Sequence, residues 1–506
     1  MKIGIVADDL TGAADSAAPF AALGWHATVQ WLPDRRRPTP GAAQIPPPCD
    51  PPESSVHIPS SGAARAISTG VRDLPETDAD EVRRRVGDAL RALGAGALDV
   101  VYKKIDSTLR GHLRLELDAV RAALPGRLAI VCPAFPANGR TVRDGVLHVH
   151  GEPRGSVREA FEMVGDPHAT EMSLPEIRGG PERVAKQLRA LHAAGAHALF
   201  CDAETDADLA AIAAALLQMP DLVLPVGSAG LAAAIAGAAE SHAPRDAGRQ
   251  TDPTDGTEAT RGGMPIAPTL RAALRELAER PVLVVVGSRH AASRGQAERL
   301  AAWAGVAPIT MVACDRPEEL VASLGQEGQD WHELGTLPGV AAESLGRDEQ
   351  DLQDGEDGIA GGTEGSGRRG AEEASGVAAV KVCADAAGAI ARRFAAGNRI
   401  VLVVTPDEDH AGFAGPAAAL ELRLSAIPAA FGLIVTGGHT AQRLIAGMPG
   451  WHGIQLVGER EPGIVVGRML ASGAAAQLHG RPIVLKAGGF GEFDTLVRCV
   501  AGGVTG

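Results

Sequence analysis

Short apolar runs alternate with segments of helical periodicity along most of the 506-residue chain. In the first half, the run from Leu98 to Tyr102 is followed by polar residues and then by apolar residues at helical spacing over 113–124. In the second half, comparable runs occupy 281–286, 399–404, 432–435 and 482–485. Strands that alternate with helices in this way build a parallel sheet with helices on both faces. We therefore predict an α/β fold of doubly wound, mostly parallel sheets.

The length of the chain predicts at least two domains, because a single hydrophobic core rarely serves so many residues. The segment 241–268 is polar, rich in Gly, Pro, Asp and Thr, and without apolar periodicity, so we expect a linker there. This division places one α/β domain at 1–240 and a second at 269–506. We expect the two domains to face each other across a cleft.

Two further segments interrupt the alternation of strands and helices. Residues 33–59 are rich in proline, with a Pro-Pro-Pro and a Pro-Pro, and predict a surface insertion. The stretch 325–376 loses its periodicity, and between 330 and 373 twelve Asp or Glu residues stand against three arginines. Such an acidic composition predicts a low-complexity insertion outside the core.

Composition excludes several classes of protein. The formal net charge of −14 argues against nucleic acid or an anionic membrane as a partner. The chain contains no run of about 18 apolar residues, so no membrane-spanning helix is predicted. The N-terminus reads as a short strand without a signal peptide, and the six cysteines form no metal-binding or disulfide pattern. We therefore expect a cytoplasmic protein with reduced thiols.

Polar residues gather where the predicted strands of the first half end. Open α/β sheets bind their ligands at the carboxyl ends of the strands. Arginine and lysine neutralise a carboxylate, and Asp or Asn form hydrogen bonds with hydroxyl groups. Each residue alone is more often part of a capped turn or a surface ion pair, but their shared position predicts a pocket for a small polyhydroxylated anion. Its candidate residues are Asp8, Asp9, Arg72, Lys104, Asp106, Ser107, Arg110, Asn138 and Arg140.

The second half has small residues at three predicted strand-to-helix turns. These turns contain Gly287-Ser288, Gly437-Gly438, and Gly488-Gly489 with Gly491. Glycine lets backbone N–H groups approach phosphate oxygens, and the start of the following helix favours negative charge. None of the turns matches G-x-x-x-x-G-K-[ST] or G-x-G-x-x-G. Three such turns in one domain, one of them beside Lys486, indicate a nucleotide site.

An anion pocket on one domain and phosphate-binding turns on the other predict phosphoryl transfer between them. This reaction needs charge neutralisation and a carboxylate near the accepting hydroxyl. Asp106 is the first candidate for the catalytic carboxylate, with Asp8 or Asp9 as alternatives, and Lys104 is the candidate catalytic cation. We expect Mg²⁺ as a cofactor held largely by the nucleotide, and no metal site made by the protein alone.

Matching segments occur along nearly the whole chain. They are Ala7 to Ala13 with Asp15, Ser68 to Arg72, Lys103 to Gly111, Pro133 to Pro136 with Gly139 to Thr141, Gly287-Ser288, Thr436 to Gly438 with Thr440-Ala441, and Lys486 to Gly491. In these segments and in their order the chain resembles the four-carbon acid sugar kinases, which include D-threonate, D-erythronate and 3-oxo-tetronate kinases. The resemblance implies an N-terminal domain that binds a small sugar acid and a C-terminal domain that binds ATP.

The resemblance also implies roles for individual residues. Asp8 or Asp9, Arg72, and the segment Lys104, Ile105, Asp106 and Ser107 would contact the sugar acid. ATP would be contacted by Ser288, Gly437, Gly438, His439, Thr440, Gly488, Gly489 and Gly491. The chain departs from the family at His439, where relatives often have an acidic residue, and at Val71, where many have serine. A homo-oligomer is left open.

Two other classes of function are weighed against the kinase. The sequence Asp-Asp-Leu-Thr-Gly at 8–12 resembles the nucleophile loop of haloacid-dehalogenase-like phosphatases, but that chemistry uses carboxylates two residues apart, and here they are adjacent. A non-catalytic sugar-acid sensor would bind the acid without ATP turnover. Release of ADP only in the presence of a tetronic acid separates the kinase from both.

Overall fold

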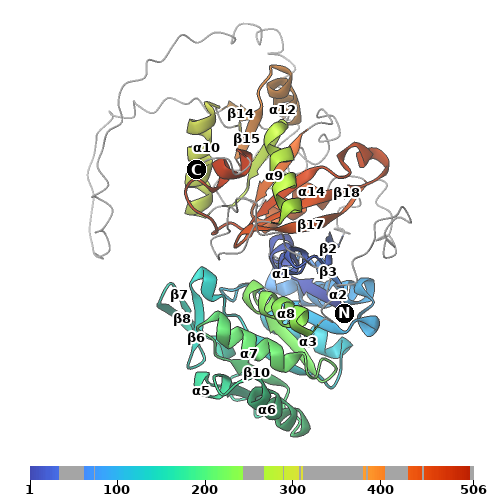
Figure 1. Ribbon diagram of the computed structural model, residues 1–506, viewed down its shortest axis with the longest axis vertical. Coiled ribbons are helices and arrows are strands. Elements are labelled where there is room, and N and C mark those ends of the chain that lie inside the picture. The colour runs from blue at the N-terminus through green and yellow to red at the C-terminus, as the bar shows by residue number, and fades with distance from the viewer. Residues whose placement is uncertain are drawn as a thin grey trace, which may run out of the picture.

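The computed structural model describes residues 1–32, 62–72, 74–242, 267–288, 290–306, 309–311, 380–382, 386–404, 431–446 and 450–501. The insertions predicted at 33–59 and 325–376, and most of the linker predicted at 241–268, lie outside these residues. We refer to residues 1–242 as the N-terminal half and to 267–501 as the C-terminal half. Figure 1 shows the two halves following one another along the long axis of the molecule, with helix α1 (Leu10–Ala22) between them.

The main sheet of the N-terminal half is parallel throughout, in the order β2-β3-β1-β4-β11-β5-β10-β9. Its strands are β1 (Lys2–Ala7), β2 (His26–Trp31), β3 (Ala63–Ser68), β4 (Val100–Lys104), β5 (Leu128–Cys132), β9 (Ala169–Met172), β10 (Ala198–Cys201) and β11 (Val223–Gly227). The other helices are α2 (Ala79–Leu93), α3 (Leu113–Ala123), α4 (Val157–Ala160), α5 (Leu174–Ile177), α6 (Pro181–Ala193), α7 (Asp206–Leu216) and α8 (Ala229–His242). Parallel pairing brings the carboxyl ends of β1, β3 and β4 to one edge of the sheet.

The loop after β5 leads into a small second sheet. A 3₁₀ turn at Pro136–Asn138 is followed by the antiparallel strands β6 (Arg140–Arg143), β7 (Val146–Val149) and β8 (Glu152–Ser156). This sheet was not anticipated from the sequence, where 133–145 was read only as a long polar loop. It fixes the backbone of Arg140, which begins β6.

The sheet of the C-terminal half is parallel in the order β14-β13-β15-β12-β16-β19 and continues into the antiparallel strands β18 and β17. Its strands are β12 (Val282–Val286), β13 (Ile309–Met311), β14 (Val380–Val382), β15 (Ile400–Val404), β16 (Gly432–Thr436), β17 (Trp451–Glu461), β18 (Ile464–Ala471) and β19 (Pro482–Lys486). Its helices are α9 (Pro268–Glu279), α10 (Ala291–Ala304), α12 (Ala386–Ala395), α14 (Gly438–Ala446) and α15 (Thr495–Val500).

The sheets of the two halves are continuous, which the sequence analysis did not predict. β17 pairs antiparallel with β2 through Ile454 opposite Val29 and Gln455 opposite Thr28. Next to this pairing, the rings of Trp31 and Trp451 meet edge to face with centroids 6.1 Å apart. The short pairing and the aromatic contact hold the two halves in one arrangement.

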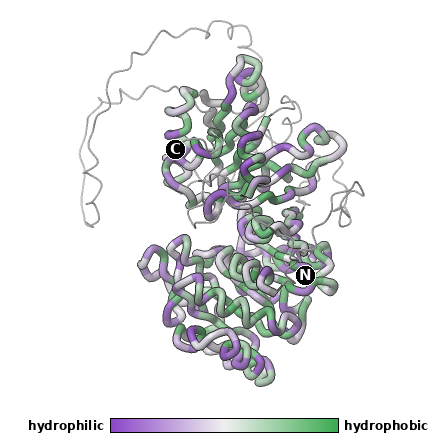
Figure 2. Tube along the Cα trace, in the orientation of Figure 1, coloured by the Kyte–Doolittle hydropathy of each residue, from purple (hydrophilic) through white to green (hydrophobic). Residues whose placement is uncertain are grey.

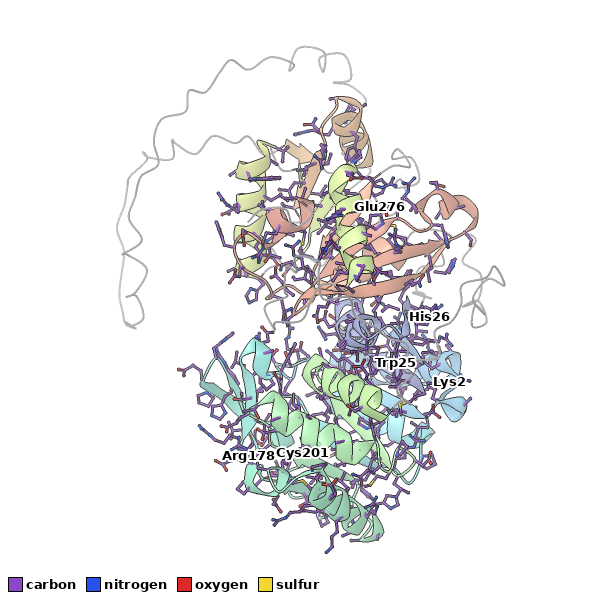
Figure 3. All side chains as sticks on the ribbon, in the orientation of Figure 1. Lys2, Trp25, His26, Arg178, Cys201 and Glu276 are labelled. Atoms are coloured by element: carbon purple, nitrogen blue, oxygen red, sulfur yellow. The ribbon has the colours of Figure 1, made fainter. Side chains whose placement is uncertain are left out.

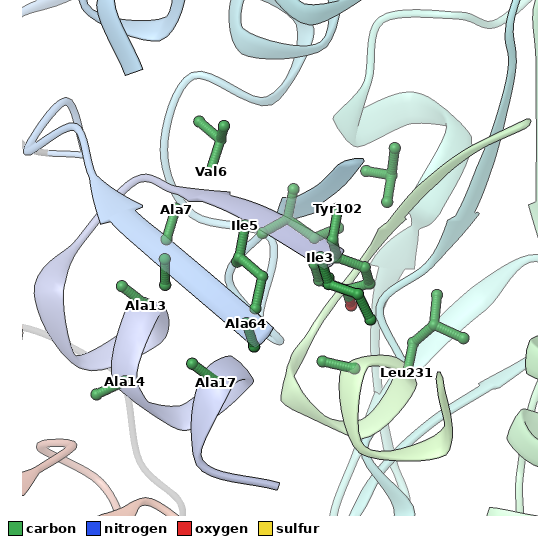
Figure 4. Close-up of a cluster of buried hydrophobic side chains, with 14 of the residues drawn as sticks. Ile3, Ile5, Val6, Ala7, Ala13, Ala14, Ala17, Ala64, Tyr102 and Leu231 are labelled. Atoms are coloured by element: carbon green, nitrogen blue, oxygen red, sulfur yellow. The ribbon is translucent and has the colours of Figure 1, made fainter. Parts of the chain in front are cut away.

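Small side chains allow α1 to lie close to the sheet. Ala13, Ala14 and Ala17 are fully buried against β1 and β3, and Figure 4 shows them beside Ile5 and Ala64. Because alanine has only a methyl group, the helix backbone approaches the strands without leaving a void. Figure 2 shows hydrophobic residues along the central strands of both halves, with hydrophilic residues on outer helices such as α6.

Ion pairs on the outer helices join neighbouring elements within each half. Arg178 binds Asp208 at 2.9 Å in the N-terminal half, and Arg468 binds Glu276 at 2.8 Å in the C-terminal half. Arg178 and Glu276 are labelled in Figure 3, in opposite halves of the molecule.

Within the described ranges, no helix is both long and apolar enough to cross a membrane. Of the cysteines, Cys132, Cys201 and Cys499 are described, and all three are buried free thiols.

Most predicted elements are found within a few residues of their expected bounds. The apolar run 128–132 is also expected from the sequence to form a strand, and β5 has the same bounds. One shift affects the candidate site. The strand expected to end at Tyr102 continues to Lys104, so both lysines lie in β4 with buried side chains.

Candidate active site

Two adjacent carboxylates follow β1 and share one guanidinium. Arg72, in the loop after β3, binds Asp8 through two hydrogen bonds of 2.6 and 2.8 Å, and its Nη1 binds Asp9 Oδ2 at 2.7 Å. Burial raises the pKa of Asp8, but the charge and hydrogen bonds of Arg72 outweigh it and hold that pKa below its ordinary value. The same side chain therefore pairs with both carboxylates.

Asp9 also begins helix α1. Its Oδ1 accepts a hydrogen bond from Gly12 N at 2.7 Å, which makes Asp9 the N-cap. From the sequence alone, Thr11 is the residue expected to cap the helix after the first strand, and the structure shows that this expectation was wrong. Thr11 is the second residue of the helix, and its hydroxyl donates to Asp9 Oδ2 at 3.0 Å.

The two lysines at the end of β4 have different surroundings. Lys103 is fully buried and forms an ion pair with Glu116 of α3 at 2.7 Å, so it supports the core of the site. Lys104 is 5% exposed and donates to the carbonyl of Ile105 at 2.8 Å. Lys104 Nζ lies over Gly12 at the start of α1, 3.0 Å from the position that a Cβ there would take. Lys104 thus brings a buried positive charge to the beginning of α1.

Asp106 accepts several hydrogen bonds from donors of its own loop. Arg110 donates from Nε and Nη2 at 2.9 Å each, and Thr108 donates from its backbone N–H and its hydroxyl. Burial raises the pKa of Asp106, but the hydrogen bonds from Arg110 and the charge of Arg72, 3.7 Å away, hold it far below its ordinary range. Asp106 is therefore a permanent anion at any working pH.

Two donors near this cluster lack a partner. Arg140 is 9% exposed, and its Nε and the side-chain amide nitrogen of Asn138 are buried without a hydrogen bond to any described residue. Arg140 also lies over the ring of Phe490 from the C-terminal half, with its guanidinium carbon 5.6 Å from the centroid. Buried donors left unpaired carry a cost of about 1–3 kcal/mol each, which a ligand oxygen would remove.

The glycine turns of the C-terminal half pack against one another. Gly437, with φ +90°, brings its Cα close to the backbone nitrogen of Ser288, and the Ser288 hydroxyl packs against Gly488. Thr440 packs directly against Gly287, where any side chain would clash. Gly489 lies against the ring of His290. Gly491, with φ +80°, instead faces Thr495 at the start of α15.

Lys486 stabilises the third of these turns through hydrogen bonds. Its side chain is fully buried and donates to Ser293 Oγ, Ala487 O and Gly488 O at 3.0 to 3.2 Å. Burial lowers the pKa of Lys486 to about 8. The ammonium therefore fixes the conformation of the turn at Gly488-Gly489 and places a positive charge next to it.

The two sets of residues meet at the junction of the halves. A Cβ on Gly438, the first residue of α14, would clash with the Asp9 carboxylate and lie 2.7 Å from the Thr11 hydroxyl. Ser68 of β3 donates to Gln442 of α14 at 2.5 Å. The two halves are in direct contact at this point. The cleft that the sequence analysis expects between them therefore stays a prediction.

The remaining site residues predicted from the sequence lie outside these two sets. Ile105 is 1% exposed in the core, and its N–H binds Gly227 O at 2.9 Å. Ser107 is half-buried beside Asp106. The backbone of His439 lies in α14, but its side chain is outside the described part. No group of three or more His, Cys, Asp or Glu within the described ranges is placed to hold a metal.

The sequence analysis gave no role to His290 or to Phe490, whose ring contacts Arg140 of the N-terminal half. Burial lowers the pKa of His290, and the charges of Lys486, Arg110 and Arg140 lower it further. Phe490 also packs against Phe135 at 6.3 Å. Both residues lie in or beside segments that the sequence analysis had selected. Their position at the ends of predicted strands was the signal that could have identified them as site residues.

Comparisons with known proteins agree with this arrangement. A family model described as a sugar-binding N-terminal domain matches residues 3–235. A D-threonate kinase from Bordetella bronchiseptica is 31% identical, over 98% of this chain and 96% of that protein. A 3-oxo-tetronate kinase from Methylobacterium radiotolerans is 30% identical, over 64% of this chain and 77% of its own. The crystal structure of a Haemophilus influenzae protein shares the fold with a TM-score of 0.52, at 18% identity over 98% of each chain.

The α/β fold and these relatives define the protein as a kinase, a phosphotransferase. The chain covers almost the full length of the Bordetella relative, and the matching segments keep their order. The chain belongs to the four-carbon acid sugar kinase family.

The close approach at Gly438 predicts an effect of one added methyl group. Gly438→Ala is expected to lower kcat/KM at least about tenfold, because the clash with Asp9 pushes the two halves apart at their junction. The control is Gly237→Ala, where a Cβ within α8 meets open space. Steady-state kinetics check this, and equal activity of both variants would contradict the close approach.

Proposed function

We propose that the protein transfers the γ-phosphoryl group of ATP to a hydroxyl of a four-carbon sugar acid. The observation that supports this most directly is a pair of buried donors, Arg140 Nε and Asn138 Nδ2, that have no hydrogen-bond partner among the described residues. Arg140 also lies over the ring of Phe490, which belongs to the third glycine turn of the other half. Donors of this kind fit the carboxylate and hydroxyl oxygens of a small acid. Relatives named as D-threonate and 3-oxo-tetronate kinases support a four-carbon acid as the substrate class.

The proposed division of labour follows the two halves. In the N-terminal half, Arg140, Asn138 and the partly exposed Arg110 would bind the acid, while Arg72 keeps Asp8 and Asp9 in place. In the C-terminal half, the turns at Ser288, Gly437-Gly438 and Gly488-Gly489 would receive the triphosphate through backbone N–H groups other than that of Gly437, which donates to Lys486 O at 2.9 Å. His439 and Thr440 begin α14 beside the second turn, and we keep them as candidate ATP contacts.

Asp106 is the proposed catalytic carboxylate. The accepting hydroxyl oxygen would form a bond to the γ-phosphorus while the bond to the ADP oxygen breaks, and the hydroxyl proton leaves to solvent. Because its pKa is so low, Asp106 would orient the hydroxyl by accepting its hydrogen bond, without storing the proton. Lys104, buried at the start of α1, would contribute positive charge next to the developing transition state.

Mg²⁺ is the proposed cofactor, and it would neutralise charge on the β- and γ-phosphate oxygens when bound.

Phosphatase chemistry at Asp8 or Asp9 is disfavoured, because Arg72 binds both carboxylates and leaves neither as a free nucleophile. A sensor without catalysis would use the same donors, and only turnover separates it from a kinase.

The function is tested by ADP release. A coupled assay with D-threonate, D-erythronate, L-threonate and the 3-oxo acids is expected to show ADP formation that depends on one or more of them. Phosphate release from sugar phosphates without ATP would favour the phosphatase. Tight binding of a tetronic acid with no ADP from any of them would favour the sensor.

Removal of the Asp106 charge tests its role. Asp106→Asn is expected to lower kcat about 10²-fold, with a smaller change in KM, because the substrate is still bound by the arginines. The control is Asp118→Asn on α3, whose carboxylate is 40% exposed and pairs with Arg114 on the surface. Near-normal turnover by the Asp106 variant would remove it from catalysis.

The lowered pKa of Lys486 predicts a pH dependence. The ammonium is charged below pH 8 and loses its charge as the pH rises through about 8, so kcat/KM for ATP is expected to fall on the alkaline side. Lys486→Met should have low activity without this alkaline limb. A wild-type profile that stays flat to about pH 9.5 would show that the charge of Lys486 is not needed.

A further inference from the structure

Gln442 of α14 reaches across the junction, and the proposed mechanism gives it no role. It is half-buried, and its Oε1 accepts a hydrogen bond of 2.5 Å from the hydroxyl of Ser68 at the end of β3. Gln442 follows Gly438 by four positions, and residues four apart lie on the same face of a helix. The face of α14 that packs Gly438 against Asp9 therefore also carries Gln442 against the end of β3.

The loop after β3 is shaped to receive this side chain. Gly70 has a φ of +65°, and the carboxamide of Gln442 occupies the space that a Cβ on Gly70 would need. Any other residue at this position would be strained at that φ and would collide with the carboxamide. Ser68 is fully buried, so its hydroxyl is removed from water and depends on a protein acceptor such as Gln442. Packing and hydrogen bonding together fix Gln442 on the loop.

The same loop carries the arginine that organises the carboxylates of the N-terminal half. Arg72 follows Gly70 by two residues, and its guanidinium binds Asp8 and Asp9. The backbone N–H groups of Val71 and Arg72 both donate to Asp8 O, at 3.1 and 3.4 Å. A displacement of Gly70 would therefore reach the guanidinium and the end of β1 within two residues.

The other end of this connection is the second glycine turn. Gly437 N donates to Lys486 O at 2.9 Å, and Gly437 packs against Ser288. α14 begins at the next residue, so its first turn is fixed to the place proposed for the triphosphate. Because backbone hydrogen bonds make one helical turn a rigid spacer, the position of this turn determines the position of Gln442.

We propose that Gln442 is a positioning residue that couples binding of the nucleotide to the arrangement of Arg72. A nucleotide bound at the start of α14 holds Gln442 against Ser68 and Gly70, and the loop then holds Arg72 and its two carboxylates in place for the acid. Gln442 acts through the loop and touches neither ligand. The coupling is reciprocal, so the acid strengthens binding of the nucleotide by the same factor. This inference rests on the proposed function for the identity of the two ligands.

Hydrogen–deuterium exchange of the full-length protein tests the coupling with nucleotide alone. Mg²⁺ and a non-hydrolysable ATP analogue, added without any acid, are expected to slow exchange of the amides of 68–72 at least about fivefold in the wild type. In Gln442→Ala this slowing is expected to be less than about twofold, while the amides of the turn at 437–438 stay protected. A merely structural role of Gln442 would not make the exchange of 68–72 depend on nucleotide.

The matched control is Gln187→Ala. Gln187 forms a hydrogen bond of the same kind, donating to Glu176 at 3.0 Å within the N-terminal half. This variant loses one glutamine side chain from a helix and is expected to show the same nucleotide-dependent protection of 68–72 as the wild type.

A second variant tests the contact from the other side of the junction. Ser68→Ala removes one oxygen atom, so it examines the same hydrogen bond even if Gln442→Ala does not fold, which thermal unfolding shows. It is expected to reduce the protection of 68–72 at least about twofold. Because both substitutions remove the same hydrogen bond, the double variant is expected to lose no more protection than Gln442→Ala alone.

Two results would overturn the proposal. One is protection of the turn at 437–438 by the nucleotide with no change at 68–72 in the wild type. The other is protection of 68–72 that is the same in the wild type, Gln442→Ala and Ser68→Ala. Failure of the proposed function would look different, because the nucleotide would then protect 68–72 through Gln442 while no tetronic acid released ADP.

Discussion

The ion pairs around Arg72 organise the N-terminal half of the candidate site. Asp8 and Asp9 are adjacent in sequence and buried at the end of β1, and Asp106 follows β4. Without a shared cation these carboxylates would repel one another or take up protons. Because Arg72 comes from the loop after β3, its guanidinium ties together the ends of β1, β3 and β4 and gives them one geometry.

The same carboxylates determine how the C-terminal half approaches. Asp9 uses one oxygen to cap α1 and the other to meet Arg72, and its carboxylate packs against Gly438. Only a residue without a side chain fits there. The start of α14 and the glycine turns next to it are thus brought against α1, and the continuous sheet through β2 and β17 maintains that position. A sugar acid and a triphosphate bound at these places would be neighbours.

Local patterns in the sequence predicted the fold class, most strands and the positions of the candidate residues. This succeeded because apolar periodicity and turn residues act over a few positions, as at β5, and because parallel strands bring their carboxyl ends to one edge. The sequence also placed Lys486 and the glycine turns in one group, and the structure shows Ser288, Gly437 and Gly488 in contact.

What the sequence did not predict depends on residues far apart in the chain. The pairing of β2 with β17 and the stacking of Arg140 on Phe490 each join the two halves, and no local pattern specifies them. The choice of Asp9 over Thr11 as the cap depends on where the strand ends, which sequence patterns locate only within a few residues. Ile105 matched the family segment, but its side chain is buried in the core. Successive side chains of an extended backbone point in opposite directions, so a residue can match a motif without facing a ligand.

The central claim is that the sugar acid and the triphosphate bind at opposite sides of one junction. A crystal structure of the protein with D-threonate and a non-hydrolysable ATP analogue tests it most directly. The account predicts the acid against Arg140 and Asn138, the γ-phosphate against Ser288 and Gly488, and a hydroxyl of the acid in line with that phosphate. Ligands bound on separate faces of the molecule, with protein between them, would contradict it.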